Sequence, residues 1–486
     1  MSMYDDYEMT IGIECHVQLA TKTKLFSTAD NDARDKEPNT CVTPIDFGLP
    51  GMLPVLNREA VNLAIKAGKA LNAPIARVSR FDRKHYYYPD LPKGYQTTQM
   101  YQPIILAGYV DAPMDDGSIV RVRIHHAHME EDAGKLTHFN GYSLVDLNRA
   151  GTPLIEIVSE PDIHSAAAAR AYATELYRLM TYAGVTHGDL YYGNMRFDVN
   201  ISVAKKGSNV LGKRAEVKNL NSFRSVERAA EYECKRQIDL LERGERMIQE
   251  TRGWNDDKQI TTSQRSKEDA QDYRYMPDAD IPPIVLTDEE IERIQAEVPM
   301  LPGEYREKWA ELGLDKSVIN SLLANQNYAR VITEIQEKSG DNTAKRVAHW
   351  FSSALIAEGS GSEADETPVD NVGMYVSIDD LTALAEMTEK AEISSTNAKE
   401  LFNELLGGAR DPRALAEKQR MLQVSDEGAI GAIVDEVLAD PASATSIADI
   451  KAGKDRAIGY LVGQVMKKSK GQANPGLAQK LIREKL

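Results

Sequence analysis

Alternation of apolar and polar side chains runs through the first 280 residues, and this period of two constrains the fold more than any other feature of the sequence. Residues 9–19 (MTIGIECHVQL) alternate as a β-strand with one buried and one solvated face does. Three further segments repeat the pattern: residues 119–124, 154–158 and 195–203. Helical periodicity interrupts the strands three times, at residues 58–71, 165–183 and 223–243. We therefore expect a mixed domain in which helices pack on a sheet.

A proline-rich stretch between residues 277 and 302 ends the strand-led region. It holds one short helix, which a capping box at residues 287–290 opens. Beyond this stretch the periodicity becomes helical, as in residues 347–357. The order of these regions predicts an α+β chain in which an all-α part follows the mixed domain.

The last 60 residues predict a small helical bundle. Apolar side chains follow helical spacing in residues 430–438 and again in residues 458–466. Gly459 and Gly463, four residues apart in the second segment, are expected to allow close approach of a neighbouring helix. Asn474 followed by proline predicts the start of a final helix.

Cysteine content and hydropathy limit the cellular setting. The 486 residues include Cys15, Cys41 and Cys234, an odd number without a CxxC pair, which excludes a disulfide framework and disfavours a thiolate zinc site. No apolar stretch approaches the length of a membrane span, and the acidic start lacks the features of a signal peptide. We expect a cytoplasmic protein that does not contact a membrane.

The net charge of -16 is unevenly distributed. Residues 451–486 contain nine Lys and Arg against Asp455 and Glu484, a net of +7, so the preceding residues carry -23. An acidic body argues against broad non-specific binding of polyanions, whereas the basic end permits contact with nucleic acid.

Glu14 and His16 lie two residues apart on an expected strand, so both side chains leave the same face. A carboxylate beside an imidazole is a possible pair of ligands for a divalent metal. A surface ion pair is the alternative interpretation, and this short pattern alone favours it.

Residues 125–135 (HHAHMEEDAGK) concentrate three histidines, three acids and a lysine. Adjacent like charges repel one another unless a cation or solvent relieves them, so the segment is either a metal site or a solvated loop. Strand-like residues precede it and favour a position at a sheet edge. Alternation places His128 and Glu130 on one face and Glu131 on the other, and it does not decide which carboxylate is the ligand.

Further polar side chains alternate on two later segments. Asp198 and Asn200 share a face of one expected strand, and Glu216 and Lys218 follow in the next polar segment. Ligand sets dominated by oxygen suit Mg²⁺ better than zinc. Magnesium with nearby lysine and arginine side chains is what phosphoryl transfer from ATP requires.

Residues 81–96 combine the cations Arg83, Lys84 and Lys93 with four tyrosines, a composition suited to gripping phosphates and stacking on bases. For the tyrosines at residues 86–88 alone, a half-buried strand is the favoured interpretation. The sequence has no Walker A loop, no GxSxG elbow, no kinase signature and no serine nucleophile paired with lysine, so we do not expect it to hydrolyse amides.

Together these segments resemble the B subunit of the bacterial aspartyl/glutamyl-tRNA amidotransferase. The resemblance runs nearly end to end and in order, through residues 11–19 (IGIECHVQL), 81–84 (FDRK), 88–96 (YPDLPKGYQ), 130–135 (EEDAGK), 146–162 (DLNRAGTPLIEIVSEPD), 218–223 (KNLNSF), 249–252 (QETR), 272–275 (DYRY) and 463–475 (GQVMKKSKGQANP).

The resemblance implies a ligase in a heterotrimer with an amidase (the A subunit) and a small third protein (the C subunit). The amidase would supply ammonia from glutamine. This chain would use ATP and Mg²⁺ to phosphorylate the side-chain carboxylate of misacylated Glu-tRNA(Gln) or Asp-tRNA(Asn), and ammonia would displace the phosphate. The implied architecture is a cradle-shaped catalytic domain (1–295), a helical domain (296–408) and a helical tail domain that binds tRNA (409–486).

Residue roles follow from the same resemblance. Glu14, His16, Glu130 and Glu131 are implied as Mg²⁺ ligands, with Glu131 the first choice. Two further candidates for that site are Asp198 and Glu216. Lys84 is implied as the catalytic cation that contacts phosphate, with Glu131 as its catalytic partner, and Lys218 and Arg274 as further nucleotide-binding residues. Some relatives carry cysteines where this chain has Thr43 and Asp46, so no zinc is expected.

Two other functions compete with catalysis. A non-catalytic scaffold that only holds tRNA would have no need for repelling carboxylates on several strands. A free-standing ATP-dependent ligase is disfavoured because the chain lacks a nucleophile for releasing ammonia. Deletion of the residues after about Asp440 is expected to weaken tRNA binding without abolishing glutaminase activity.

Overall fold

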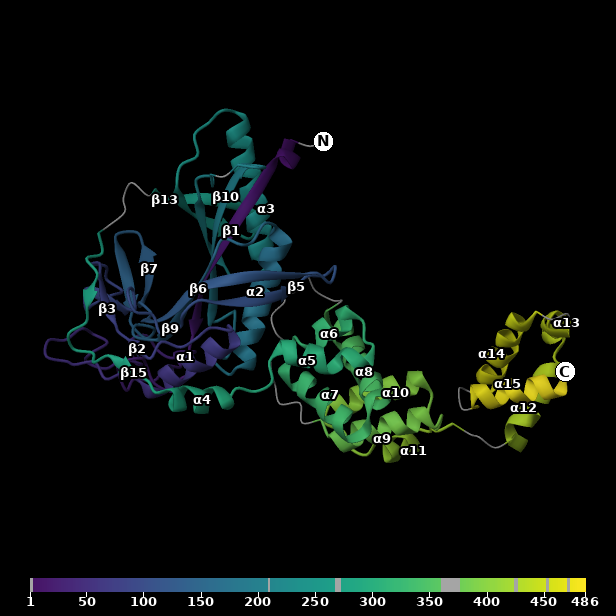
Figure 1. Cartoon of the computed structure of the whole chain (residues 1–486). Coiled ribbons are helices and arrows are strands. Elements are labelled where there is room, and N and C mark those ends of the chain that lie inside the picture. The colour runs from purple at the N-terminus through teal and green to yellow at the C-terminus, as the bar shows by residue number, and fades with distance from the viewer. Residues whose placement is uncertain are drawn as a thin grey trace. The chain divides into compact units, whose positions relative to one another are not determined.

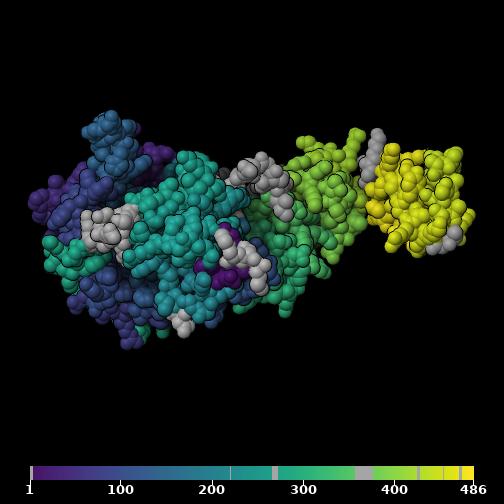
Figure 2. All heavy atoms as spheres, turned by 90° about the horizontal axis from the view of Figure 1, so that it is seen from above, coloured from purple at the N-terminus to yellow at the C-terminus, as the bar shows by residue number. Residues whose placement is uncertain are grey.

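The computed structural model describes residues 3–208, 210–266, 272–359, 376–423, 427–451, 454–469 and 473–486. The described chain divides near residue 305 into two compact units (Figures 1 and 2). An eight-stranded sheet forms the centre of the first unit, and the described part of the second unit is helical. The predicted α+β class is confirmed. The predicted domain boundaries at 295/296 and 408/409 stay predictions.

The central sheet has the order β13-β12-β11-β10-β1-β9-β6-β5. Neighbouring strands are antiparallel except for the parallel pair of β11 and β12. The bounds are β1 (Tyr7–Gln18), β5 (Gly108–Pro113), β6 (Ile119–Glu131), β9 (Pro153–Ser159), β10 (Met195–Lys205), β11 (Ala215–Leu220), β12 (Glu250–Asn255) and β13 (Ile260–Ser266). The four strand segments predicted from alternation are therefore β1, β6, β9 and β10.

One face of this sheet is apolar and fully covered. Ile13, Cys15, Ile157 and Val199 point to this face and are at most 1% exposed. Helices α2 (Ala166–Tyr182) and α3 (Phe223–Glu242) pack on it side by side, as Figure 1 shows. Serine side chains cap both helices, since Ser165 and Ser222 accept from the backbone N–H three residues on. Because alternation commits the apolar side chains to the helices, the polar side chains must lie on the opposite face.

Smaller pieces stand beside the sheet. They are α1 (Arg58–Ala70), α4 (Asp288–Ala296), a three-stranded sheet of β14 (Met276–Pro277), β3 (Asp82–His85) and β4 (Tyr95–Thr98), a pair of β2 (Val78–Ser79) and β15 (Ile284–Val285), and a hairpin of β7 (Lys135–Phe139) and β8 (Tyr142–Asp146). The hairpin projects from the surface in Figure 2. The predicted capping box is confirmed at α4, where Thr287 Oγ1 accepts from Glu290 N at 3.2 Å.

Helices make up the rest of the described chain. Their bounds are α5 (Pro302–Lys308), α6 (Lys316–Leu322), α7 (Gln326–Ser339), α8 (Asp341–Gly359), α9 (Ile378–Glu389), α10 (Ser395–Leu406), α11 (Pro412–Lys418), α12 (Glu427–Ala439), α13 (Ala444–Lys451), α14 (Ile458–Lys468) and α15 (Pro475–Lys485). Aromatic rings of Tyr328, Phe351 and Phe402 pack at the centre of the α7–α10 region, with centroids 4.4 and 5.0 Å apart.

Helices α12, α14 and α15 share a hydrophobic core of their own, which includes Ile430, Val434, Leu461, Val465 and Ile482. Asn474 caps α15, as predicted. The prediction about Gly459 and Gly463 was wrong: a Cβ added at either position would meet no atom within 4 Å. Both glycines lie away from the helix packing that Leu461 and Val465 make.

Candidate metal and phosphate site

The uncovered face of the central sheet carries a band of polar side chains across five adjacent strands. Strand pairing places Glu14 beside Asp198, and it places Glu156 between His16 and His128. Directly paired residues point to the same side of a sheet. The members of the band are Glu14, His16, His128, Glu130, Glu156, Asp198, Asn200, Glu216 and Lys218.

Three of these side chains converge closely enough to bind one metal ion. His16 Nε2 lies 3.5 Å from Glu130 Oε1 and 3.8 Å from Glu156 Oε2. The three ligand atoms all lie within 4.8 Å of one another, and the three residues come from β1, β6 and β9. Two carboxylates and one imidazole suit Mg²⁺ or Mn²⁺, which complete their coordination with water and phosphate oxygens. The donor set therefore fits the expected cation.

A second imidazole, that of His128, contacts the carboxylates of Glu130 and Glu156. His128 Nε2 lies 3.2 Å from Glu156 Oε2 and 3.8 Å from Glu130 Oε2. Burial disfavours the charged form of His128, but the two carboxylates outweigh burial and raise its pKa to about 9. Burial likewise opposes ionisation of Glu156, and the bond to His128 nevertheless holds the pKa of Glu156 below its usual range. Both carboxylate orientations are thus constrained by a charged partner.

Glu14 stands at the edge of this cluster. Asn200 Nδ2 donates to Glu14 Oε1 at 2.9 Å. Burial, followed by the charges of Glu156, Glu216 and Asp198, raises the pKa of Glu14. Besides burial, the neighbouring carboxylates contribute to this raised pKa, so negative charge accumulates here and a cation would be stabilised.

Lys218 forms ion pairs with Asp198 and Glu216, the two acids that the resemblance made further candidates for the metal site. Its Nζ lies 2.7 Å from Asp198 Oδ2 and 2.9 Å from Glu216 Oε1, and Thr251 Oγ1 donates to Glu216 Oε2 at 2.8 Å. Burial opposes the charge on Lys218, but the two carboxylates raise its pKa. Asp198 and Glu216 therefore hold a permanent cation on the sheet face and are not part of the His16–Glu130–Glu156 cluster.

A cavity of about 830 Å³ lies over this band. Glu14, His16, Glu130 and Glu156 line one side, and Lys84, Gln96 and two tyrosines, Tyr273 and Tyr275, line it as well. Lys84 extends from β3, with its Nζ 4.9 Å from the centre of the Tyr273 ring. The cavity thus combines a carboxylate cluster with the cations Lys84 and Lys218, and its volume suits a nucleotide.

Glu131 does not join the metal cluster. It follows Glu130 on β6, so its side chain points to the other side of the strand, where it contacts Lys93 Nζ and accepts from Thr97 N at 3.0 Å. There it belongs to a separate buried charged group with Lys24 and Asp46. The structure therefore brings Glu130, and not Glu131, to His16 and Glu156, whereas the resemblance made Glu131 the first choice of ligand.

Two other sequence-based interpretations concern Arg274 and the tyrosines after β3. Arg274 is exposed and is not among the described residues that line the cavity, although its neighbours Tyr273 and Tyr275 are. Its carbonyl oxygen lies 3.0 Å from His85 Nδ1, which fixes the segment to β3. The tyrosines after β3 do not form a strand, because β3 ends at His85 and Tyr87 is 86% exposed.

Sequence reasoning missed Glu156. It is the one charged residue of β9, with Leu154, Ile155, Ile157 and Val158 around it. A lone carboxylate in an otherwise apolar strand could have indicated it, because a buried carboxylate needs an ion-pair partner or a bound cation. His128 was placed on the correct face but was not assigned a role.

The chain is similar to proteins of one known family. Residues 9–292 match the GatB/GatE catalytic domain, and residues 330–486 match the GatB domain. The chain is 44% identical over 487 residues to the B subunit of the aspartyl/glutamyl-tRNA(Asn/Gln) amidotransferase of Lachnospira eligens, with 99% of each chain covered. The proteins of the same name in Halorhodospira halophila and Persephonella marina are 45% and 43% identical over 485 residues, covering 99% of this chain and 99% and 100% of their own.

The sheet, its polar band and the helices that follow define a GatB/GatE-type catalytic domain joined to a helical GatB domain. The chain belongs to the family of B subunits of the aspartyl/glutamyl-tRNA(Asn/Gln) amidotransferases. Among the helices of the described residues, none has the length and apolar character to cross a membrane.

Proposed function

We propose that this chain is the ATP- and Mg²⁺-dependent subunit that amidates misacylated Glu-tRNA(Gln) or Asp-tRNA(Asn). The observation that carries the proposal is the convergence of His16, Glu130 and Glu156 beneath a cavity that Lys84 and Lys218 also line. Family membership supports the class of reaction, because the relatives are named as the B subunit of such an amidotransferase.

The proposed reaction has two steps, phosphorylation of the carboxylate and its amidation. A side-chain carboxylate oxygen of the glutamyl or aspartyl group attacks the γ-phosphorus of ATP, and ADP leaves. Ammonia then attacks the activated carbonyl carbon, phosphate departs, and the nitrogen loses a proton to give the amide. A divalent cation bound by His16, Glu130 and Glu156 would neutralise charge on the phosphates.

The chain's own residues position the reactants. Lys84 lies on β3. Lys218 lies on β11, where it forms ion pairs with Asp198 and Glu216. Because Lys218 is fixed by two carboxylates, its charge is pre-organised toward the cavity and needs no rearrangement when phosphate arrives. His128 keeps Glu130 and Glu156 aligned. In this proposal Lys84 contacts the transferred phosphate.

The same proposal includes partners. We infer a heterotrimer with a glutaminase (the A subunit) and a small third protein (the C subunit), in the cytoplasm. The glutaminase supplies ammonia, and the C-terminal helices of this chain hold part of the tRNA. Co-purification of the chain from its host, followed by assays for an associated glutaminase and bound tRNA, tests the assembly. A chain that purifies alone and amidates tRNA with glutamine would contradict it.

The catalytic proposal is tested with Glu156→Gln in the assembled enzyme. We expect tRNA amidation to fall at least a hundredfold while glutaminase activity stays within about twofold, since only the cation site changes. Glu8→Gln on β1, far from the cluster and half exposed, is the control and should leave both activities unchanged. A scaffold without chemistry would retain amidation in the Glu156 variant, and that result would reject catalysis by this chain.

A further inference from the structure

Two adjacent histidines on β6, His125 and His126, face each other outside the site already described. Their Nδ1 atoms lie 2.7 Å apart, and their ring centroids are 5.0 Å apart at an interplanar angle of 74°. His125 is exposed and His126 is half-buried. Neither residue lines the polar cavity or belongs to the His16–Glu130–Glu156 cluster. The proposed function therefore gives this histidine pair no role.

A β-bulge brings the two side chains to the same side of the strand. Consecutive residues of a regular strand point to opposite faces, so an unbroken β6 would separate them. The pairing of β6 with β9 shifts between Ile124, which pairs with Ser159, and His126, which pairs with Val158. His125 is thus the extra residue of a bulge, a feature that bends a strand and re-aims a side chain.

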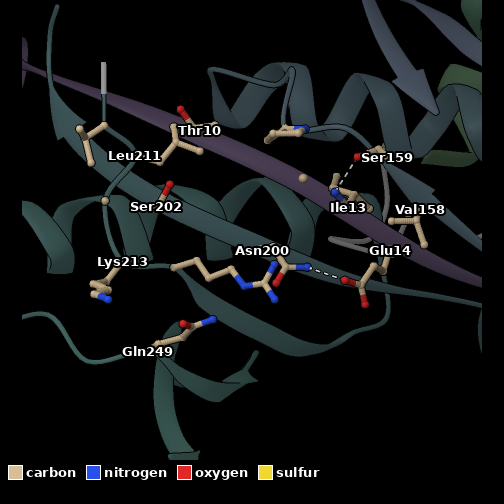
Figure 3. A pocket seen from close by; sticks show the side chains of 15 residues that line it. Thr10, Ile13, Glu14, Val158, Ser159, Asn200, Ser202, Leu211, Lys213 and Gln249 are labelled. Atoms are coloured by element: carbon tan, nitrogen blue, oxygen red, sulfur yellow. Dashed lines mark hydrogen bonds between the residues drawn. The ribbon is translucent and has the colours of Figure 1, made fainter. Parts of the chain in front are cut away.

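Hydrogen bonds on both sides of the bulge hold it in place. Before it, Glu160 N donates to Arg123 O at 2.8 Å, and the Arg123 guanidinium donates to the two carboxylate oxygens of Asp162 at 2.8 and 2.7 Å. On the other side of β9, Ile13 N donates to Ser159 Oγ at 2.8 Å, the dashed line that ends at Ser159 in Figure 3. The two imidazoles are therefore positioned before any ligand arrives, which lowers the entropic cost of binding one.

The pair offers nitrogen ligands that no carboxylate occupies. Among the described residues, the ion pairs between histidine and carboxylate are those of His16, His128 and His164. Burial, followed by the charges of His128 and His125, lowers the pKa of His126 to about 4, so this imidazole is neutral at pH 7. Neutral imidazole is the commonest metal ligand in proteins. His126 Nε2 lies 3.1 Å from His128 Nδ1, and such a contact at the far nitrogen orients a metal-binding ring.

Nitrogen ligands select a different cation from the oxygen-rich cluster. Imidazole suits Zn²⁺, Ni²⁺ and Cu²⁺, whereas Mg²⁺ prefers carboxylate and water oxygens. Zn–N bonds of about 2.0–2.1 Å place two ligand nitrogens roughly 3 Å apart, close to the separation of the two Nδ1 atoms. Because His125 is exposed, water can fill the other positions on the ion. The sequence disfavours a thiolate zinc site, and this pair would bind the ion through imidazole instead.

We propose that His125 and His126 form a binding site for a divalent transition-metal ion of the Zn²⁺ class, separate from the proposed Mg²⁺ site. The inference does not depend on the proposed function, because it involves neither ATP nor tRNA. The ion would lie one imidazole away from the carboxylates of the first site, since His126 contacts His128, and His128 contacts Glu130 and Glu156.

Calorimetric titration of the full-length chain with Zn²⁺ in excess Mg²⁺ tests the site. We expect His125→Gln to raise the Kd for Zn²⁺ about tenfold or more, because it removes one of two protein ligands. His126→Gln should have the same effect. His187→Gln, which removes an exposed histidine elsewhere in the same unit, is the matched control and should change the Kd by no more than about twofold.

Three results would overturn the inference. The unaltered chain could fail to bind Zn²⁺ in excess Mg²⁺, or His125→Gln could bind Zn²⁺ as tightly as the unaltered chain does. The third result is a loss of Zn²⁺ affinity in Glu156→Gln but not in His125→Gln, which would assign the ion to the carboxylate cluster. Because His125 is exposed, its replacement is expected to leave the fold intact, and urea unfolding of the variant checks this.

Discussion

Glu130 and Glu131 are adjacent in the sequence, yet a single residue step on β6 gives them different surroundings. Glu130 faces His16 across the strand pairs, and Glu131 faces Lys93 and the backbone of Thr97. Each carboxylate is only 3% exposed, so neither is a solvated surface charge. The two residues therefore serve different sites.

We expect Glu130→Gln to raise the Kd for Mn²⁺ at least tenfold, because the cation loses a charged ligand. Glu131→Gln should leave that Kd within about twofold and lower the free energy of unfolding by about 1–3 kcal/mol, because Lys93 loses its charged partner. Calorimetric titration with Mn²⁺ and urea unfolding measure the two quantities. A loss of Mn²⁺ affinity in the Glu131 variant alone would show that the wrong carboxylate has been assigned.

His126 supplies a prediction about pH. Burial, followed by the charges of His128 and His125, lowers the pKa of His126 to about 4. Below about pH 6.5 His126 becomes protonated in the unfolded chain but stays neutral in the folded chain. The free energy of unfolding therefore decreases as the pH falls from about 6.5 toward 4. His126→Gln should therefore reduce the loss of unfolding free energy between pH 7 and pH 5.

Urea unfolding at the two pH values measures this effect. His187→Gln, at an exposed position in the same unit, is the control and should behave like the unaltered chain. Equal losses in the His126 variant and the unaltered chain would count against the proposed origin of the acid sensitivity.

At the scale of elements, the two faces of one strand divide stability from function. On β9, Ile157 is fully buried against the helices, and the adjacent Glu156 faces the cavity. We expect Ile157→Ala to lower the free energy of unfolding by about 2–5 kcal/mol, because it leaves a cavity in the core. Glu156→Gln should change it by about 1 kcal/mol or less, since His128 keeps Glu130 as a partner.

The measurement is urea unfolding of both variants beside Mn²⁺ titration. Ile157→Ala should retain Mn²⁺ affinity under conditions where it is folded, and Glu156→Gln should lose it. If both variants lost stability equally and neither lost affinity, the separation of the two faces would be refuted.

At the scale of the whole chain, the C-terminal helical bundle carries less net charge than its last 36 residues suggest. The net of +7 over residues 451–486 omits α12 and α13, which share the same bundle. Residues 427–486 hold nine Lys and Arg against seven Asp and Glu, a net of +2. In the described residues three of the cations pair with α12: Lys468 Nζ lies 3.2 Å from Glu436 Oε2, Lys485 Nζ lies 2.6 Å from Asp435 Oδ1, and Lys480 Nζ lies 3.4 Å from Glu427 Oε1. The electrostatic contribution to tRNA binding is correspondingly smaller than the sequence count indicates.

The same core decides where the chain can be cut. Deletion after Asp440 would leave the apolar face of α12, with Ile430 and Val434, without Leu461 and Ile482. Deletion after Gln423 removes the bundle as a unit. For this second truncation we expect tRNA affinity to fall about tenfold while Mn²⁺ binding persists. The slope of the logarithm of the tRNA association constant against the logarithm of the salt concentration should become less steep by about one to three, because phosphate contacts are lost. Unchanged tRNA affinity would exclude the C-terminal helices as a contact.

The sequence by itself predicted the strands β1, β6, β9 and β10 and the helices α1, α2 and α3, because alternation and helical spacing record which side chains need burial. For Glu14, His16 and the Glu130–Glu131 pair it left a metal site open beside an ion pair or a solvated loop, and only the family resemblance implied that they are ligands. Only the tertiary structure chose Glu130, added Glu156 and assigned Asp198 and Glu216 to Lys218. These choices depend on the pairing of β1, β6, β9, β10 and β11, and strand register brings together residues up to about 200 positions apart that no local pattern connects.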